Sequence, residues 1–199
     1  MKLTSIKQQV KRAGRYSIFV EGKYAFSLSE IALLESKLVG GQELSKEQVA
    51  EFKKLSNDDK LYNRALNYVA LRPRSAWEIE TYLERKDASP PLVQQILNKL
   101  SIINLIDDEK LAKAFVHDRH LLRPTSRRKI TAELRKKRIA DDIIQKVIGT
   151  DQQDEQAALR DVIERKRRQT KYQDDLKLMQ YLARQGFNYD DIKSALQNL

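Results

Sequence analysis

The sequence predicts a mainly α-helical protein, with three tandem three-helix repeats in an elongated, curved array and a small β-meander at the N-terminus. Three observations predict this fold. The 199 residues include only four Pro and six Gly, which leaves few tight turns and favours long helices. One helical frame recurs three times, with starts 51 and 48 residues apart. Residues 2–29 differ, because their apolar side chains alternate as they do in strands.

The β-meander is expected over residues 2–29. Since a lone hairpin is only marginally stable, residues 2–9 are expected to add a strand before a turn at Ala13-Gly14. Gly22 can take the positive φ of the hairpin turn that follows. Short helices near residues 29–38 and from Ser45 complete an N-terminal region of residues 1–56. The alternating apolar residues of the hairpin are Tyr16, Ile18 and Val20, then Tyr24, Phe26 and Leu28.

The repeated frame is a polar N-cap followed by an aliphatic residue, a Leu and an apolar residue at positions four, eight and thirteen. The N-cap side chain can accept from a first-turn amide, and Glu78 can complete a capping box with Ser75. An amphipathic helix precedes each frame and another follows it, which predicts repeats at residues 57–106, 107–150 and 151–199. Because each bundle buries little alone, the repeats are expected to stack. The frames are Ser75, Ile79, Leu83, Ala88; Ser126, Ile130, Leu134, Ile139; and Asp174, Leu178, Leu182, Phe187.

Positive charge is concentrated in the second repeat. The chain carries a net charge of +10, and residues 107–150 supply half of it, with 12 cations against 7 acids. Residues 123–138 hold eight cations and one acid, Glu133. On a helical wheel Arg128, Thr131 and Arg135 share one side, Lys129 and Lys136 lie together beside it, and Ile130 and Leu134 face away. The pattern predicts a basic face on a helix whose other face is core.

This basic face has two interpretations, an ordinary solvated helix or a surface that binds phosphates or an acidic protein. Like charges with so little compensation repel one another, which favours the binding surface. A second basic run at residues 165–171 is bracketed by acids, so a solvated face is an equal alternative there. The candidate contact residues are Arg72, Arg74, Arg123, Arg127, Arg128, Lys129, Arg135, Lys136, Lys137, Arg138, Arg165, Lys166, Arg167 and Arg168. Of these, Arg127, Arg128, Lys129, Arg135 and Lys136 are expected to make the principal contact.

Several classes of function are disfavoured by the sequence. The absence of Cys excludes disulfides and thiolate metal sites. With no secretory h-region and no long apolar run, a cytoplasmic protein outside the membrane is expected. No nucleophile, base or phosphate-loop motif is present, so a binding protein without catalytic residues or cofactor is expected rather than an enzyme. His117 and His120 are interpreted as surface residues rather than metal ligands. Trp77 and Tyr82 could stack bases, or Trp77 could seal a joint between repeats.

Two motifs, "ALNYVALRPRS" and "IDDEKLAKAFV", resemble the signature region of the RecX family, regulators of the RecA recombinase. "ITAELRKKRIADDIIQKVI" and "MQYLARQGFNYDDIKSAL" are similar to later repeats, and "RYSIFVEGKYAFSLS" to the N-terminal extension of the longer members. The resemblance implies a protein that lies in the groove of the RecA filament on single-stranded DNA. There it would limit ATP hydrolysis, strand exchange and filament extension, in recombination, DNA repair and the SOS response. An array with polar ends can be monomeric, so a monomer is expected.

The resemblance has departures. The family usually has Lys-Gly after the second helix of each repeat; here only Gly186 keeps the glycine, and Arg138 is expected to disfavour the left-handed cap more than Asp87 does. Relatives with this extension often carry a further C-terminal repeat, so a shorter span of filament is expected.

Two alternatives to filament regulation remain open. One is a helix-turn-helix-like protein that binds DNA directly, and the other is an interaction scaffold whose charge only solubilises it. The basic helix has no Asn or Gln, the natural adenine readers, so contact with phosphates is expected rather than base readout.

Overall fold

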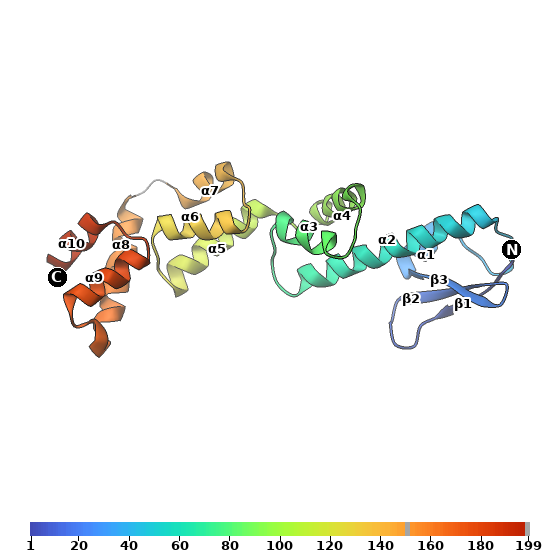
Figure 1. Cartoon of the computed structure of the whole chain (residues 1–199), viewed down its shortest axis with the longest axis horizontal. Helices are drawn as coiled ribbons and strands as arrows, with labels where there is room; N and C mark the ends of the chain where they lie inside the picture. Colours follow the sequence, from blue (N-terminus) through green and yellow to red (C-terminus); the bar gives the residue numbers. More distant parts are fainter. Residues whose placement is uncertain (150–151, 198–199) are drawn as a thin grey trace. The chain divides into compact units, whose positions relative to one another are not determined.

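The computed structural model describes residues 1–149 and 152–197. Its chain forms two compact units, Met1–Arg72 with Ile79–Leu105, and Pro73–Glu78 with Ile106–Leu199. Within the described residues, three β-strands precede ten α-helices (Figure 1). The predicted fold class, mainly α with helical repeats and a small N-terminal sheet, is confirmed.

The sheet is an antiparallel meander of β1 (Leu3–Gln8), β2 (Arg15–Val20) and β3 (Lys23–Ser29). The β2–β3 turn has positive φ at Glu21 and Gly22, 49° and 73°, which confirms the hairpin turn predicted there. After β3, Ser29 caps the short helix α1 (Glu30–Ser36). The buried face of the sheet packs against α2 (Lys46–Ala70), as Figure 1 shows, through a core of Leu3, Ile18, Val20, Phe26, Leu28, Leu44 and Val49.

A buried polar network joins α2 to the sheet. Arg15 of β2 forms an ion pair of 3.1 Å with Asp59 of α2, and both side chains are almost fully buried. The Asp59 carboxylate also accepts from the backbone amide of Ser29 at 2.9 Å. One turn earlier, the buried Ser56 hydroxyl donates to the carbonyl oxygen of Ser27 at 2.6 Å. The boundary expected after residue 56 therefore falls inside a continuous helix that is bonded to the sheet.

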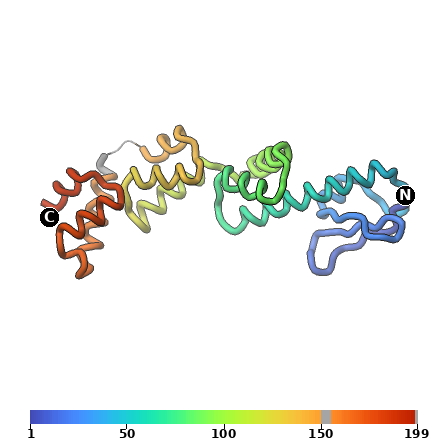
Figure 2. The backbone as a smooth tube through the Cα atoms, viewed as in Figure 1, coloured from blue at the N-terminus to red at the C-terminus, as the bar shows by residue number. Residues whose placement is uncertain are grey.

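The helices of the three repeats follow in order along the chain (Figure 2). In all three frames the predicted aliphatic residue and Leu are buried. Ser126 and Asp174 cap their helices as predicted, and Ser75 and Glu78 form the predicted capping box. Beyond α2, the helices are α3 (Ala76–Glu84), α4 (Pro90–Ile102), α5 (Asp108–Leu122), α6 (Arg127–Lys136), α7 (Asp141–Ile148), α8 (Gln152–Arg167), α9 (Asp175–Arg184) and α10 (Tyr189–Gln197), with a 3₁₀ turn η1 (Thr170–Tyr172) before α9.

The second helix of each repeat ends in the same left-handed cap. Positive φ occurs at Asp87, Arg138 and Gly186, with values of 60°, 56° and 89°. In each case the following amide bonds back across the turn, as when Ile139 N donates to Leu134 O at 3.3 Å. Arg138 thus keeps the cap geometry despite lacking the glycine. Its side chain is exposed, so no packing clash adds to the backbone cost.

Within the second unit, two carboxylates bind the first amide of a helix in the same way. Asp108 of α5 accepts from the first amide of α3, at Ala76, and Glu155 of α8 accepts from the first amide of α6, at Arg127. Both distances are 2.9 Å. Burial raises the pKa of both carboxyl groups. These contacts place the cations of α6 beside the start of α3 and beside α8.

Candidate nucleic-acid interface

Helix α6 is the centre of the basic surface. Ile130 and Leu134 are buried in the core of the second repeat, together with residues of α5 and α7. The helix is short and its cations lie on two sides of it, next to different neighbours. These two sides form two distinct basic surfaces, which are described in turn.

The first surface is a shallow hollow beside the start of α3, called here the Trp77 hollow. The Trp77 ring is 39% exposed, and the guanidinium carbon of Arg138 lies 5.9 Å from its centroid. Arg135 forms a 2.8 Å ion pair with Asp141 in which both side chains are more than half exposed, so it contributes little rigidity. Arg128 and Lys136 have no carboxylate partner within the described ranges. The hollow is lined by Trp77, Arg128, Thr131, Ala132, Arg135, Lys136 and Arg138.

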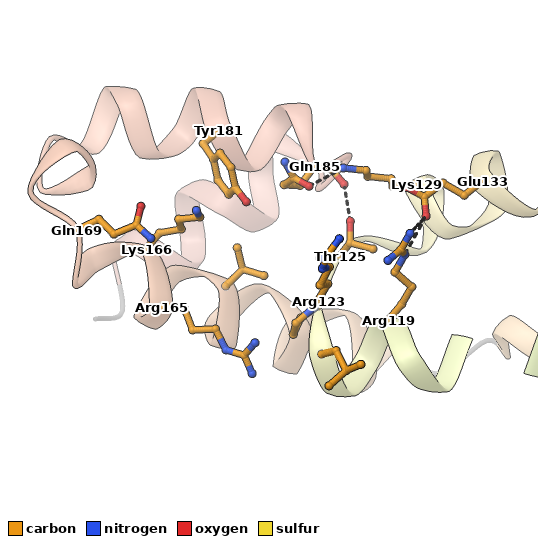
Figure 3. A pocket seen from close by; sticks show the side chains of 13 residues that line it. Arg119, Arg123, Thr125, Lys129, Glu133, Arg165, Lys166, Gln169, Tyr181 and Gln185 are labelled. Carbon is orange, nitrogen blue, oxygen red and sulfur yellow. Dashed lines mark hydrogen bonds and ion pairs between the residues drawn. The ribbon is translucent and has the colours of Figure 1, made fainter. Parts of the chain in front are cut away.

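The second surface is an open pocket of about 420 Å³ between the second and third repeats, called here the inter-repeat pocket. Figure 3 shows the side chains that line it, which come from α5, α6, α8, α9 and the adjoining loops. Glu133 binds the Arg119 guanidinium through two nitrogens at 2.8 Å. The pocket is lined by Arg119, Leu122, Arg123, Pro124, Thr125, Lys129, Glu133, Val162, Arg165, Lys166, Gln169, Tyr181 and Gln185.

The structure separates Lys129 from Lys136, which the helical wheel placed together. Lys136 lines the Trp77 hollow, whereas the Lys129 ammonium donates to the Gln185 side-chain oxygen at 2.6 Å in the inter-repeat pocket. The two lysines are seven residues apart on α6, and their side chains reach different surfaces because the end of α9 supplies an acceptor beside Lys129, which a helical wheel does not contain. Arg127 turns toward Glu155, with 3.9 Å between Nε and the carboxylate. Its Nη2 atom is buried without a hydrogen-bond partner in the described structure.

Several other candidate cations are held by structural contacts. Arg74 is mostly buried and pairs with Glu78, and the same carboxylate accepts from Lys137 at 3.3 Å. Arg167 donates to the carbonyl oxygens of Tyr172 and Gln173 and pairs with Asp175. These contacts stabilise turns and joints, which leaves less of their charge for a partner. The side chains of Arg72 and Arg168 are exposed.

Sequence reasoning found only Arg123, Lys129, Arg165 and Lys166 of the residues that line the inter-repeat pocket. Those that it missed include Arg119, Tyr181 and Gln185. Arg119 stood outside the cationic run, and the other two belong to a repeat with no net charge. Tyr82, one of the two proposed base-stacking residues, lies parallel to Tyr68 with 4.1 Å between ring centroids, so that one face is covered. No group of three or more His, Asp or Glu that could hold a metal occurs in the described part of the chain. None of its described helices has the length and apolar character needed to cross a membrane.

The comparisons with known proteins agree along the chain. The models described as "Regulatory protein RecX N-terminal domain" and "RecX, first three-helix domain" match residues 1–45 and 62–100, and those of the second and third domains match residues 107–148 and 153–196. Regulatory protein RecX of Lactobacillus johnsonii is 38% identical over 72% of this chain and 52% of its own length, so the chain spans about half of that relative. The Bacillus subtilis protein is 28% identical over 99% of this chain and 76% of its own.

Solved structures of the same name share the fold. A crystal structure of regulatory protein RecX aligns over 98% of both chains with a TM-score of 0.75 and 28% identity. RecX from Lactobacillus salivarius aligns over 72% of this chain and 96% of its own, with a TM-score of 0.61 and 27% identity. The N-terminal sheet and the three helical repeats therefore correspond, domain by domain, to the parts of one family, and the chain belongs to the RecX family of regulatory proteins.

Proposed function

We propose that the protein binds the RecA filament on single-stranded DNA and limits its ATP hydrolysis, strand exchange and extension. Family membership supports this role. The observation that carries the proposal at residue level is the Trp77 hollow, where four cations surround an exposed indole ring. A filament that contains DNA offers phosphates to those cations and unstacked bases to that ring.

The chemistry of the hollow suits the backbone of a nucleic acid. Cations that neutralise phosphates release counterions and bind without regard to sequence. Arg128 and Lys136 are exposed and carry their charge into the hollow without a carboxylate partner in the described structure. The Trp77 ring adds a stacking surface, which tolerates any base. The hollow is therefore proposed as the contact with filament-bound DNA.

Direct binding to DNA without RecA is the second candidate, because the same hollow would hold a bare strand. The two functions differ in what RecA contributes. A filament regulator inhibits at concentrations too low to coat free DNA, whereas a DNA binder inhibits only by competing for the strand.

The deciding experiment is a titration of this protein into RecA hydrolysing ATP on single-stranded DNA, beside a titration of the same DNA alone. Inhibition well below the concentration that saturates bare DNA supports filament recognition. Inhibition that follows saturation of the DNA supports the second candidate, and no inhibition contradicts the proposal.

Charge reversal tests the hollow within the same assay. The double variant Arg128→Glu/Lys136→Glu is expected to inhibit at least about tenfold more weakly, because two phosphate contacts become repulsive. The matched control is Lys177→Glu/Lys193→Glu, which makes the same charge change at two exposed lysines of the third repeat. Equal loss in both variants would show that only net charge matters.

A further inference from the structure

The inter-repeat pocket has more positive than negative side chains in its lining. Among the described residues its lining holds five cations, Arg119, Arg123, Lys129, Arg165 and Lys166, and one acid, Glu133. The single acid is already engaged by Arg119 through two nitrogens. A cavity with an excess of cations attracts an anion, since its walls focus the field.

The other four cations differ in how they are compensated. Arg165 shares a 3.0 Å ion pair with Asp161, in which both side chains are about half exposed. Lys129 donates only to a neutral amide, that of Gln185. The Lys166 ammonium lies over two rings, 4.6 Å from the centroid of Tyr181 and 5.2 Å from that of Tyr172. Neither Lys129, Lys166 nor Arg123 has a carboxylate partner in the described structure.

Rings and amides hold an ammonium group in place without cancelling its charge. A cation over an aromatic face keeps free donors for a further ligand. Figure 3 shows Lys166 and Tyr181 facing the same space as Arg123 and Thr125. Lys129 and Lys166 are thus held in place before a ligand arrives, which lowers the ordering cost of binding.

We propose that the inter-repeat pocket binds a terminal phosphate or polyphosphate group, which carries two or more negative charges. Its volume of about 420 Å³ suits a small ligand. The cations come from α5, α6, α8 and the adjoining loop, so they surround the ligand rather than lie along a strand. Gln169 and Tyr181 add neutral donors for phosphate oxygens. A backbone phosphodiester has one charge per phosphate and would leave more of the cations unbalanced.

This site is separate from the Trp77 hollow, so it goes beyond the proposed function. The ligand would contact the second and third repeats together and would stabilise their joint by binding the folded state alone. Because the test uses the full chain without RecA or DNA, its failure leaves filament regulation untouched.

The test is a calorimetric titration of the full chain with pyrophosphate at physiological ionic strength. Saturable binding of one pyrophosphate is expected. The double variant Arg123→Gln/Lys166→Gln should bind at least about tenfold more weakly, because two charge-assisted hydrogen bonds are lost. The control Lys177→Gln/Lys193→Gln removes the same charge from exposed positions outside the pocket and should bind as the parent does. Circular dichroism checks folding, and Arg123→Gln alone, at an exposed side chain, repeats the test without disturbing the tyrosines.

Competition identifies the source of the phosphate. Displacement of pyrophosphate by a non-hydrolysable ATP analogue points to a free nucleotide. Displacement by a 5′-phosphorylated oligonucleotide, but not by its 5′-hydroxyl counterpart, points to the end of a strand. Either result supports the proposal. Equal displacement by both oligonucleotides, absence of saturable binding, or equal weakening in the control variant would overturn it.

Discussion

The Asp108 carboxylate accepts a hydrogen bond from the backbone amide of Ala76 at 2.9 Å, which binds α5 to the start of α3 within the second unit. Glu155 makes the same contact with the amide of Arg127, at the start of α6. Ala76 and Arg127 each follow an N-cap serine, so each donates one of the first-turn amides that a helix leaves unsatisfied. An acid there also meets the positive end of the helix. The starts of α3 and α6 are thus bound in the same way within the second unit.

Removing the Asp108 carboxylate is expected to destabilise the protein. In Asp108→Ala the Ala76 amide loses its acceptor in a half-buried site, which costs about 1–3 kcal/mol. Asp108→Asn keeps a side-chain oxygen and should cost less than half as much. Asp118→Ala, at an exposed position of the same helix, is the control and should change stability by no more than about 0.5 kcal/mol. Urea unfolding measures all three, and similar values for the Ala and Asn variants would argue against the capping role.

The pKa values of two neighbouring carboxyl groups of α5, Asp108 and Glu109, are expected to shift in opposite directions. Burial raises the pKa of Asp108, whereas hydrogen bonds from Lys113 and Lys146 lower the pKa of Glu109 to about 2. Because the folded state holds the Asp108 proton more tightly, this group contributes less stability as pH rises through its folded pKa. The Glu109 contribution is present above its ordinary value of 4.5 and is lost as pH falls toward about 2.

Carboxyl-carbon NMR titrations measure the two values separately. Lys113→Met/Lys146→Met should return the pKa of Glu109 toward its ordinary value and leave that of Asp108 raised. A downward shift of Asp108 in the parent protein would contradict the burial argument, because opposite charges rather than desolvation would then dominate.

The fold was predictable where the signal is local. The caps at Ser126 and Asp174 and the buried Ile130 and Leu134 follow from spacing within one or two helical turns. The contact between Asp108 and Ala76 was not predictable, because these residues are 32 positions apart and no periodicity links an acid to a distant amide.

The candidate site was predictable only in part, for the same reason. The wheel placed Arg128 and Arg135 on one side, and both line the Trp77 hollow. It could not separate Lys129 from Lys136, because the partner of Lys129 is Gln185, 56 residues away. Assignment of cations to surfaces needed the stacking of the repeats, which the sequence predicts only in outline.

Substitution of Gly186 should destabilise the protein far more than substitution of Asp87 or Arg138, which occupy the equivalent caps. Gly186 has a φ of 89°, and a Cβ built on it would lie 2.4 Å from the Ser126 hydroxyl oxygen. Gly186→Ala therefore combines backbone strain with a clash at the cap of α6, and a loss of about 2–4 kcal/mol is expected. Arg138→Gly relieves a left-handed Arg and should gain up to about 1 kcal/mol. Thermal unfolding measures both, and a neutral Gly186→Ala would mean that the turn moves freely.

The buried pair of Arg15 and Asp59 should be the most sensitive polar contact of the N-terminal region. Asp59→Ala leaves the Arg15 guanidinium buried without its partner, which costs about 3–5 kcal/mol. The double variant Arg15→Met/Asp59→Leu removes both charges and should lose less than the sum of the single losses. Asp58→Ala is the neighbouring control, because burial raises the pKa of Asp58 and its charge gains nothing. Chemical unfolding of the parent, Arg15→Met, Asp59→Leu and the double variant closes the cycle, and additive losses would refute the coupling.

Trp77 is the one tryptophan of the sequence, so its fluorescence reports on the hollow directly. Titration with oligo-dT at low salt is expected to quench it, because a base stacks on the exposed ring while phosphates meet Arg128 and Lys136. Trp77→Ala should weaken binding by about 1–3 kcal/mol, and Trp77→Phe by less, since it keeps an aromatic face.

A second reading of the same titration separates the hollow from other DNA contacts. Anisotropy of labelled oligo-dT follows total binding, and quenching follows contact at Trp77. In Arg128→Glu/Lys136→Glu both midpoints should move to higher protein concentration together, because the same cations hold the strand against the ring. Binding by anisotropy without any change in fluorescence would place the strand elsewhere, and the inter-repeat pocket would then be the next surface to test.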